Sequence, residues 1–540
     1  MKGFEFRGTE LRLKRREVLA AAAGGAVGLA ALGPLATTVS ADAAPTYGGS
    51  LKIGLRGDVS RLDPHHFFPP YPTSNALALI YNGLTEPDYD TNLVPALASA
   101  WEVSKDGLTW TWHIRRDVTF HNGRLMTGAD IKANLERVLN PRTGAVIRGE
   151  LSVIDRIDLL DDYTLRTTLK DRYYPLPAML SNRWVPIIDP QSLDSIKQHP
   201  IGTGPFKFVS WKRLHTTVMA RHDTYWEKDA DGNPLPYLDE IIGKPLTDDT
   251  VRLTALRTGE VDMIDAASYR DQARFSEWTD TFDTYLIKAL GTIWYYFNAQ
   301  RPPFDDVRVR RAVAMAVDKK EIMRKTLFGH GEVMDQFYTK ASPWRLPGVA
   351  AEEFNPDEAR RLLKEAGIRR GTPLTLITFN RFNYIKEGAQ VFQQQMRQIG
   401  FMVNLKIMDW GQLTAARKSR EWDIFGLGSA YRMDPHEYYF KELSSESPAS
   451  AQTYGGWVNP DYDRVIAAAR RTEDKAERMG LYAEAEKLIR EEAPKVRTIS
   501  AHNLSAWHKH VRAYRPNIAG NITYRAGGFR SAWRLPSTAD

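Results

Sequence analysis

The chain has 540 residues and contains no cysteine. This absence excludes a disulfide framework, a zinc site built on thiolates and a cysteine nucleophile. It also excludes a lipid anchor carried on an N-terminal cysteine, so we do not expect the mature protein to be held at a membrane in that way.

Long runs of one residue type are also missing from the mature part of the chain. After residue 43 no segment has 18 apolar residues in succession, as a transmembrane helix would need. After the first 20 residues no cluster of lysine and arginine stands out, and the formal net charge is only +7. A weak positive charge without a basic stripe gives little support to a nucleic-acid partner, and we expect none.

The sequence lacks the motifs that mark common catalytic sites. It has no Gly-x-Ser-x-Gly, no His-Glu-x-x-His, no Walker loop and no Gly-x-Gly-x-x-Gly after a predicted strand. Gly202 and Gly204 have no third glycine, and Pro205 has no N–H to offer a phosphate. His65 and His66 are neighbours on an extended segment, where successive side chains point to opposite sides. We therefore expect no enzyme activity, no cofactor and no metal site.

The N-terminus has the features of an export signal. Arg15 and Arg16 precede an uncharged stretch, residues 18–39, that is rich in alanine and glycine, and Ala41-Asp42-Ala43 follows as a small-x-small cleavage site. The paired arginines resemble a twin-arginine signal, although valine stands where phenylalanine is more usual. A membrane anchor is the alternative, but four glycines and a proline make this stretch a poor spanning helix. We expect export to the periplasm with cleavage near Ala43.

The segment from Ile201 to Trp226 contains the most informative local pattern. Two glycines flank a threonine before Pro205, which is typical of a rigid turn that leads into a strand. Two alternating runs, from Phe206 and from Thr217, are separated by a polar turn and predict a β-hairpin. Gly-Thr-Gly-Pro-Phe, a strand and then Tyr-Trp resembles the central signature of the bacterial extracellular solute-binding proteins of family 5. These are the oligopeptide-, dipeptide- and nickel-binding receptors of ABC importers.

Other segments resemble the same family, so that the resemblance covers nearly the whole mature chain. They are the strand 48–57 followed by Leu-Asp-Pro, the run 93–139, the string Gly-Glu-Val-Asp at 259–262 and the segment 303–312. The resemblance implies an α/β protein with the two-lobed fold of type II periplasmic binding proteins (cluster C). In this fold the first lobe is discontinuous and carries an extra subdomain.

The implied domains follow from the same resemblance. After the signal peptide, residues 1–43, the first lobe comprises 47–85, 200–290 and 500–540, the extra subdomain 86–199, and the second lobe 291–499. Local patterns independently predict a helix at 131–139, an aromatic strand at 292–298, and a strand and turn at 118–123. Strand 373–379, helix 388–399, strand 401–408 and a helix from Gln412 alternate, which predicts parallel pairing.

The resemblance also implies ligand contacts. Trp410 resembles the pocket tryptophan of dipeptide receptors, although core packing explains a tryptophan equally well. Arg381 lies near the position of the arginine that pairs with a peptide carboxylate. Tyr71 and Thr73 are expected contacts in the segment that leads from Leu-Asp-Pro to the ligand cleft.

The loop from Gly428 to His436 departs from the family pattern. In peptide receptors this loop carries an aspartate that holds the free amine of the ligand, whereas Tyr431 and Arg432 occupy that neighbourhood here. A guanidinium repels an ammonium and favours a carboxylate or phosphate. Asp434 keeps the Asp-Pro turn, and His436 resembles the histidine that touches the metal chelate in nickel-binding members. A lone histidine is alternatively a surface or core residue.

The function that the resemblance implies is capture of a solute outside the cytoplasm. Such receptors close on a small ligand between their lobes and deliver it to an ABC permease in the inner membrane. We expect a peptide-like or anionic ligand and a monomeric protein. The alternatives are a nickel-chelate receptor of the same family, a secreted hydrolase of peptides or glycans, and a peptide-binding chaperone.

Overall fold

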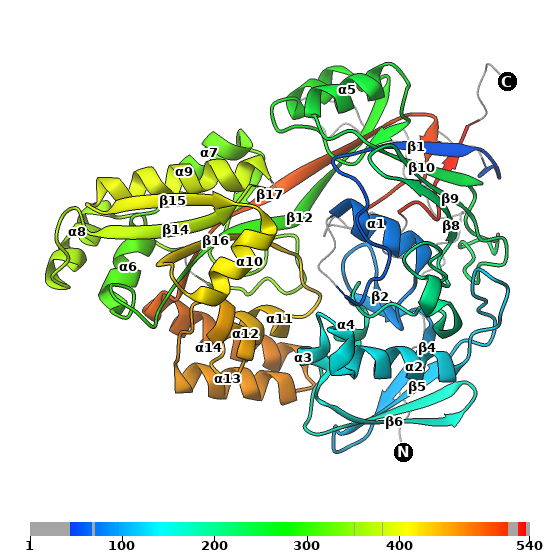
Figure 1. Ribbon diagram of the computed structural model, residues 1–540, viewed down its shortest axis with the longest axis horizontal. Coiled ribbons are helices and arrows are strands. Elements are labelled where there is room, and N and C mark those ends of the chain that lie inside the picture. Colours follow the sequence, from blue (N-terminus) through cyan, green and yellow to red (C-terminus); the bar gives the residue numbers. More distant parts are fainter. Residues whose placement is uncertain (1–43, 67–70, 350, 381, 517–527, 536–540) are drawn as a thin grey trace, which may run out of the picture. The chain divides into compact units, whose positions relative to one another are not determined.

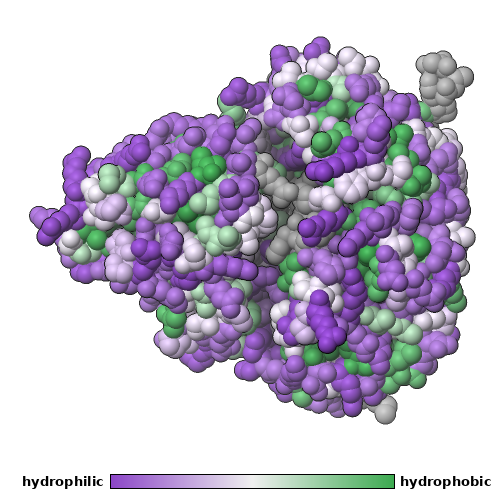
Figure 2. Space-filling model, in the orientation of Figure 1, coloured by the Kyte–Doolittle hydropathy of each residue, from purple (hydrophilic) through white to green (hydrophobic). Residues whose placement is uncertain are grey.

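The computed structural model describes residues 44–66, 71–349, 351–380, 382–516 and 528–535. The expected signal peptide, residues 1–43, and the expected ligand contact Arg381 lie outside the described residues. None of the described helices is long and apolar enough to cross a membrane. Most of the face shown in Figure 2 is hydrophilic, and its hydrophobic patches are small and separate.

Eleven strands of the described residues form one mixed sheet (Figure 1). Its order is β15–β14–β16–β12–β17–β11–β1–β10–β9–β8, and β13 pairs with β17. The strands are β1 (Ser50–Leu55), β8 (Phe206–Lys212), β9 (Thr216–Arg221), β10 (Glu240–Pro245), β11 (Met263–Ile264), β12 (Phe282–Phe297), β13 (Gly331–Val333), β14 (Pro373–Phe379), β15 (Met402–Met408), β16 (Ile424–Ala430) and β17 (Lys495–His508). Strands β8 and β9 pair antiparallel, which confirms the predicted hairpin.

Two long antiparallel strands, β12 and β17, run side by side through the middle of this order (Figure 1). Their register shifts between Ile287 and Gly291. The predicted aromatic strand is the second half of β12, whereas its first half and β17 have no clear sequence pattern. Strand β17 is buried along nearly its whole length, including Lys495 and Arg497, so polar and apolar residues do not alternate in it.

The β14–β16 region has the parallel pairing that the sequence predicts, since β14 pairs in parallel with both β15 and β16. Helix α9 (Asn383–Gln398) connects β14 to β15, and α10 (Trp410–Ser419) connects β15 to β16. The buried face of α9 includes Ile385, Phe392 and Met396. Asp409 caps α10 by accepting a hydrogen bond from the N–H of Gln412, so this helix begins two residues before the predicted start.

The other helices of the C-terminal half surround these strands. They are α6 (Val307–Met315), α7 (Lys319–Leu327), α8 (Pro356–Glu365), α11 (His436–Tyr438), α12 (Pro448–Thr453), α13 (Pro460–Arg471) and α14 (Lys475–Glu492). A short π-helical turn, Tyr439–Leu443, continues α11.

A separate antiparallel sheet has the order β4–β5–β7–β6. Its strands are β4 (Ala98–Val103), β5 (Thr109–Ile114), β6 (Ile154–Asp161) and β7 (Thr164–Leu169). Helix α2 (Gly128–Leu139) confirms the helix predicted from residue 131, and its N-terminus carries a capping box of Thr127 and Asp130. Of the strand and turn predicted at 118–123, the turn is present, since the N–H of Gly123 donates to the carbonyl of Phe120 at 2.8 Å. The strand is only an isolated bridge between Thr119 and Leu125, because the chain turns back at once.

The remaining short elements are α1 (Tyr71–Ile80), β2 (Thr85–Pro87), β3 (Leu93–Pro95), α3 (Arg148–Leu151), α4 (Leu176–Leu180), α5 (Asp249–Arg257), β18 (Val511–Arg512) and β19 (Trp533–Arg534). Three 3-10 turns occupy Pro141–Thr143, Pro190–Ser195 and Gln272–Glu277.

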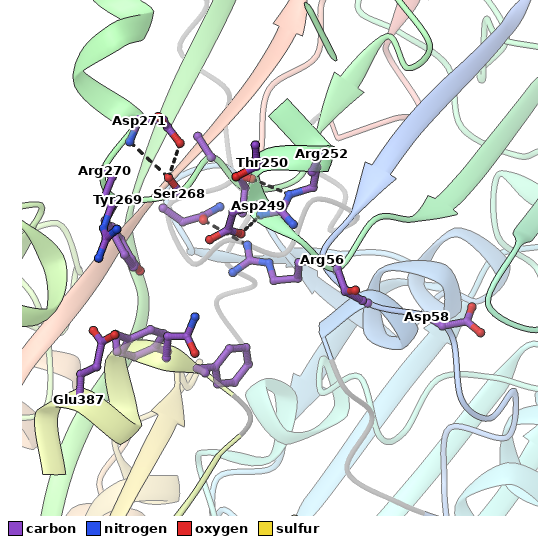
Figure 3. Close-up of a pocket in the computed structure, with 18 of the residues that line it drawn as sticks. Arg56, Asp58, Asp249, Thr250, Arg252, Ser268, Tyr269, Arg270, Asp271 and Glu387 are labelled. Carbon is purple, nitrogen blue, oxygen red and sulfur yellow. Dashed lines mark hydrogen bonds and ion pairs between the residues drawn. The ribbon is translucent and has the colours of Figure 1, made fainter. Parts of the chain in front are cut away.

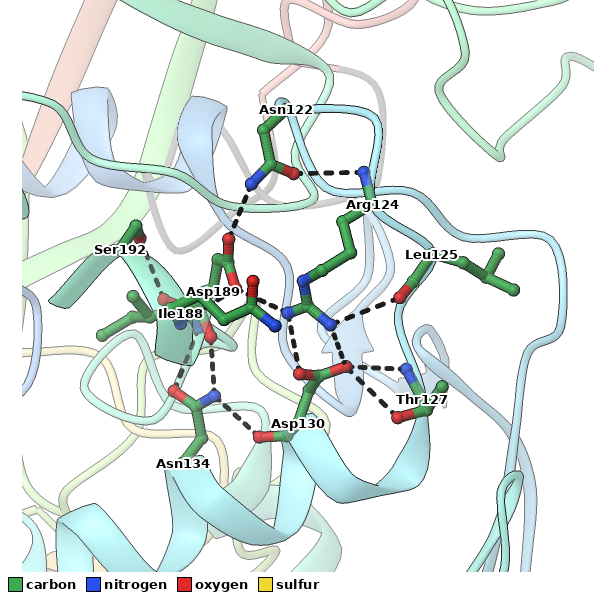
Figure 4. A network of polar contacts seen from close by, with 10 residues as sticks. Asn122, Arg124, Leu125, Thr127, Asp130, Asn134, Ile188, Asp189 and Ser192 are labelled. Atoms are coloured by element: carbon green, nitrogen blue, oxygen red, sulfur yellow. Dashed lines mark hydrogen bonds and ion pairs between the residues drawn. The ribbon is translucent and has the colours of Figure 1, made fainter.

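A polar network ties the start of α2 to two distant segments (Figure 4). The Nη2 atom of Arg124 lies 2.7 Å from Asp130 and 2.5 Å from Asp189. The side chain of Asn134 exchanges two hydrogen bonds with the backbone of Ile188. These contacts hold the 122–127 turn and the 188–192 segment against the helix.

The buried apolar side chains fall into four clusters. Core A lies within 293–501, and core B within 84–187 together with Tyr225, Trp226, Leu235, Tyr237 and Trp533. Core C draws on 51–81, on parts of 188–263 and on 507–532. Core D comprises residues of 253–282 with Leu504 and Ala506.

Candidate functional site

A cavity of about 1130 Å³ opens at the ends of several of these elements (Figure 3). It is lined by Arg56, Gly57, Asp58, Val59, Ser60, Trp211, Arg213, Leu214, Thr247, Asp249, Thr250, Arg252, Ala266, Ala267, Ser268, Tyr269, Arg270, Asp271, Thr326, Phe328, Phe382, Asn383, Tyr384, Glu387 and Asn503. We call it the large cavity. Its walls come from loops after β1 and β11, from the β8–β9 turn, and from α5, α7, α9 and β17.

Two residues that follow β1 fix the charge of one wall. The guanidinium of Arg56 forms an ion pair with Asp265 at 3.2 Å and donates to the side-chain oxygen of Asn503 at 3.1 Å. Asp58 accepts hydrogen bonds from the indole of Trp211 at 3.1 Å and from the backbone N–H of Leu214 at 2.6 Å. The Asp58 carboxylate therefore holds the tip of the β8–β9 hairpin against the cavity.

The start of α5 supplies a second, fully committed arginine. Arg252 is buried, and its guanidinium donates to the carbonyls of Ala266 at 2.9 Å and Leu246 at 2.8 Å. It also forms an ion pair with Asp249, one turn earlier in the helix. Arg252 thus holds the 266–271 segment in place and has few donors left for a ligand.

One wall of the large cavity is aromatic. The rings of Tyr269 and Tyr384 are 6.1 Å apart and perpendicular, and Phe382 stacks on Tyr384 at 5.6 Å. Burial raises the pKa of Tyr384 to about 12, so its hydroxyl stays protonated and can donate at neutral pH. This wall offers flat apolar faces together with phenolic hydroxyls.

Three charged groups of the large cavity are the least committed. Arg213 and Arg270 are both exposed, and neither forms an ion pair within the described part of the chain. The Arg270 guanidinium lies 5.4 Å from the ring centroid of Phe328, and Figure 3 shows it on the opposite side of the cavity from Glu387. Burial raises the pKa of Glu387, while Lys386 and Arg270 oppose that rise. The cavity therefore presents accessible groups of both signs to a solute.

The structure places Trp410 beside the large cavity, outside its lining. Trp410 is the first residue of α10 and 39% exposed. Its ring packs on Phe379 at 5.6 Å, and Phe379 packs on the cavity residue Phe382 at 6.3 Å. Two aromatic contacts thus connect Trp410 to the aromatic wall.

The expected contacts of the 428–436 loop are engaged by the protein itself. The Tyr431 hydroxyl lies 2.9 Å from the Thr91 hydroxyl and 2.8 Å from that of Ser342. Arg432 lies 3.5 Å from Glu437, and its guanidinium is 5.1 Å from the ring of Trp184. None of these side chains lines the large cavity.

The next two loop residues are more deeply buried. Asp434 forms an ion pair with Arg478 at 2.7 Å and accepts the backbone N–H of His436 at 2.9 Å. The His436 ring stacks on Phe440 at 4.8 Å and meets the edge of Tyr173 at 5.1 Å. Burial lowers the pKa of His436 well below its usual value, so its ring is neutral at neutral pH.

Thr73 and Tyr71 lie in α1. The Thr73 side chain is buried and accepts a hydrogen bond from the backbone N–H of Ser60, a cavity residue, at 2.9 Å. Tyr71 is the first residue of the helix, and its side chain is outside the described part of the structure. Thr73 thus does not line the large cavity but holds the backbone of the cavity residue Ser60 in place.

The cavity residues themselves were not anticipated from the sequence pattern. A signal was nevertheless present, because Arg56 and Tyr269 follow β1 and β11, which are parallel. The carboxyl ends of parallel strands meet at one edge of a sheet, where α/β proteins bind ligands.

Comparison with known proteins identifies the family. Residues 92–451 match the bacterial extracellular solute-binding proteins, family 5 Middle. The chain belongs to this family. As a family 5 member it is a solute-binding protein, a class that functions in transport, and the predicted two-lobed α/β fold is confirmed.

Individual relatives agree with this assignment. The family 5 protein is 28% identical to the glutathione-binding protein GsiB of Pectobacterium atrosepticum over 469 residues, covering 82% of this chain and 88% of GsiB. It is 28% identical to di/tripeptide-binding protein 2 of Pseudomonas aeruginosa over 494 residues, covering 82% of this chain and 87% of that protein. The solved structure of AgaA from A. tumefaciens R10, in complex with agropinic acid, has a TM-score of 0.79 and 25% identity, covering 91% of this chain and 99% of AgaA.

Proposed function

We propose that the protein captures a small peptide-like or otherwise anionic solute in the large cavity and delivers it to an ABC permease in the inner membrane. The proposal rests on charged side chains of both signs that line this cavity and form no ion pair within the described residues. Arg213 and Arg270 supply cationic donors for a carboxylate, and Glu387 supplies an acceptor for an ammonium. A short peptide or amino-acid conjugate carries both charges.

The size and walls of the large cavity support the same class of ligand. A volume of about 1130 Å³ is slightly above the range of about 300–1,000 Å³ of ordinary ligand pockets, so the cavity has room for a ligand of drug size or larger. The wall of Tyr269, Phe382 and Tyr384 offers apolar surface and hydroxyls, which suits a side chain attached to a polar backbone. GsiB and di/tripeptide-binding protein 2 are named for ligands of this kind.

We also propose that the lobes have the boundaries implied by the family: 47–85, 200–290 and 500–540 for the first, 291–499 for the second and 86–199 for the extra subdomain. The register shift between Ile287 and Gly291 supports a boundary near residue 290. The confinement of core A to 293–501 supports the second lobe. Core B is built mainly from 84–187, which supports the subdomain, and Tyr225, Trp226, Leu235, Tyr237 and Trp533 of the first lobe pack against it.

In this proposal the protein is exported as a monomer, its signal peptide carries Arg15 and Arg16, and it leaves its ligand chemically unchanged. The test is calorimetry with a panel of dipeptides, tripeptides and glutathione, followed by mass spectrometry of each ligand after incubation. Saturable binding of at least one ligand with its mass unchanged is the expected result. Turnover of the ligand would support a hydrolase, and failure of every candidate to bind would overturn the proposed ligand class.

A further inference from the structure

A second cavity, of about 460 Å³, lies where residues of core A and core B meet. It is lined by Thr91, Asn92, Leu93, Trp101, Val103, Trp110, Tyr174, Pro177, Ala178, Pro343, Trp344, Met433, Asp434, Glu473, Lys475 and Arg478. We call it the tryptophan cavity. It shares no lining residue with the large cavity, so a ligand bound here would not occupy the proposed solute site.

Four aromatic side chains form the walls of the tryptophan cavity. Trp101 and Trp110 come from β4 and β5, and the ring of Tyr174 meets that of Trp110 at 6.1 Å in an edge-on arrangement. Trp344 is fixed because its indole N–H donates to the carbonyl of Met433 at 2.9 Å. Flat rings held in place by such contacts are suited to a planar apolar group.

Two residues of the lining carry buried N–H groups without a partner among the described residues. They are Trp110 and Arg478, and each is only 5% exposed. Neither the indole Nε1 of Trp110 nor the Nε of Arg478 has a hydrogen-bond partner among the described residues. A buried N–H without an acceptor costs free energy, so a small shift of the lining that exposed either group to a ligand acceptor would be favoured.

One cation of the lining, Lys475, has no ion pair within the described residues. It is exposed and lies 4.8 Å from the ring centroid of Trp344. Of the two acidic residues in the lining, Asp434 is paired with Arg478, and Glu473 accepts a hydrogen bond from the neutral Tyr174 hydroxyl. Lys475 is thus the lining cation that can pair with a ligand carboxylate.

We propose that the tryptophan cavity binds a small aromatic carboxylate. Its ring packs between the tryptophan and tyrosine faces, and its carboxylate pairs with the exposed ammonium of Lys475. Because the walls come from both cores, such a ligand stabilises the arrangement in which these cores meet, and it is thereby coupled to solute capture.

The test is calorimetric titration of the full mature chain with indole-3-acetate and with the neutral indole-3-acetamide. We expect one saturable site for the acetate and at least tenfold weaker binding of the amide. Trp101→Ala should weaken the acetate at least tenfold, and the exposed Lys475→Gln several-fold with little effect on the amide. Arg213→Gln, in the large cavity, and Lys364→Gln, exposed on α8, should bind the acetate as the wild type does.

Three results would overturn the inference: no saturable binding of indole-3-acetate, binding that Trp101→Ala leaves unchanged, or binding that Arg213→Gln abolishes. Circular dichroism checks that Trp101→Ala folds, and Lys475→Gln gives an independent test if it does not. Titrations of the wild-type protein with both ligands separate the two proposals. Binding of indole-3-acetate without binding of any peptide would count against the proposed function, and binding of a peptide without binding of indole-3-acetate would count against the second site.

Discussion

The ammonium of Lys495 lies 2.7 Å from the carboxylate of Glu442, and their side chains are 0% and 3% exposed. The Tyr296 hydroxyl donates to the same carboxylate oxygen at 2.8 Å. The ring centroids of Trp294 and Phe337 are each 3.9 Å from the ammonium nitrogen. Burial among these rings lowers the pKa of Lys495 to about 7, although Glu442 opposes the shift.

This pair makes the stability of the protein dependent on pH. The folded-state pKa of Lys495 is about 7, whereas an unfolded lysine titrates near 10.4. Between these values the unfolded chain holds more protons, so this residue makes the free energy of unfolding rise with pH by up to about 1.4 kcal/mol per unit. In denaturant titrations from pH 7 to 10, Lys495→Met should show a flatter rise than wild type. Lys364→Met, at an exposed site on α8, should keep the wild-type slope, and equal slopes in both variants would contradict the assignment.

Arg432 is expected to be essential for stability, because its partner is buried. Removing one member of a buried ion pair costs up to roughly 3–5 kcal/mol, since the other charge is left unpaired. Glu437 is only 2% exposed as a side chain and also accepts from the amide of Asn182 at 3.2 Å. Burial raises the pKa of Glu437 to about 7, so without Arg432 this carboxyl can take up a proton, and the cost falls toward the lower end of that range. Arg432→Ala should therefore lower the free energy of unfolding strongly, whereas Arg432→Met with Glu437→Gln should lower it less.

The same variants decide whether Arg432 also contacts a ligand. Peptide affinity measured by calorimetry at a temperature where Arg432→Ala is folded should stay near the wild-type value. A loss of affinity with unchanged stability would place Arg432 at the solute site, as its position in the ligand-binding loop of the family predicts.

The sequence predicts features that depend on a few neighbouring residues, but not contacts between residues far apart in the chain. The hairpin at β8–β9 and helix α2 are predictable because turn glycines, caps and apolar periodicity act over a few residues. The partner of Arg432 is Glu437, but the burial of both depends on Trp184 and Asn182, about 250 residues away in the chain. No local pattern carries that information.

Local sequence patterns do not predict the candidate site either, because its walls come from segments far apart in the chain. The large cavity takes its walls from segments near residues 56, 211, 250, 268, 328 and 384, and the β1–β11 pairing that gathers some of them is two residues long. The family resemblance supplied positions in the 428–436 loop instead, whose side chains here contact other parts of the protein.

Arg213 and Arg270 should determine the affinity for a ligand carboxylate. A hydrogen bond to a charged group contributes about 1.5–3 kcal/mol, which corresponds to roughly tenfold to a hundredfold in affinity. Arg213→Gln and Arg270→Gln should each weaken the best peptide of the panel by this amount while leaving the melting temperature unchanged, because both side chains are exposed.

The C-terminal amide of the same peptide is the matched ligand for this test. It lacks the carboxylate, so the two arginine variants should bind it as wild type does. Arg464→Gln, at an exposed position of α13, should not change the affinity of either ligand. Equal weakening of acid and amide would mean that the arginines do not recognise the carboxylate.

Neither glycine of the Gly-Thr-Gly-Pro-Phe turn should tolerate a side chain. A Cβ atom at Gly202 would lie 2.2 Å from the carbonyl oxygen of Ile80, and Gly204 is equally crowded. A Cβ atom at Gly204 would lie 2.3 Å from the carbonyl oxygen of Leu79 and 2.5 Å from the carbonyl carbon of Ile80, at the end of α1. Both atoms belong to the backbone, so relief requires the helix to move. The N–H of Gly204 donates to Ile80 at 2.9 Å, and its own carbonyl lies 3.1 Å from ring nitrogens of His121 and His222.

Gly204→Ala should therefore push the turn away from the end of α1. This movement would also disrupt the hydrogen bonds that Gly204 makes with Ile80, His121 and His222. Overpacking of a well-packed site typically costs about 1–3 kcal/mol, and a clash with backbone lies at or above the upper end. Gly149→Ala is the matched control, since no atom lies within 4 Å of a Cβ there, and its effect should stay within about 0.5 kcal/mol. Denaturant unfolding of the two variants measures the difference. Equal stability of both would show that the end of α1 can shift away from the turn, and that the turn does not require its second glycine for close packing.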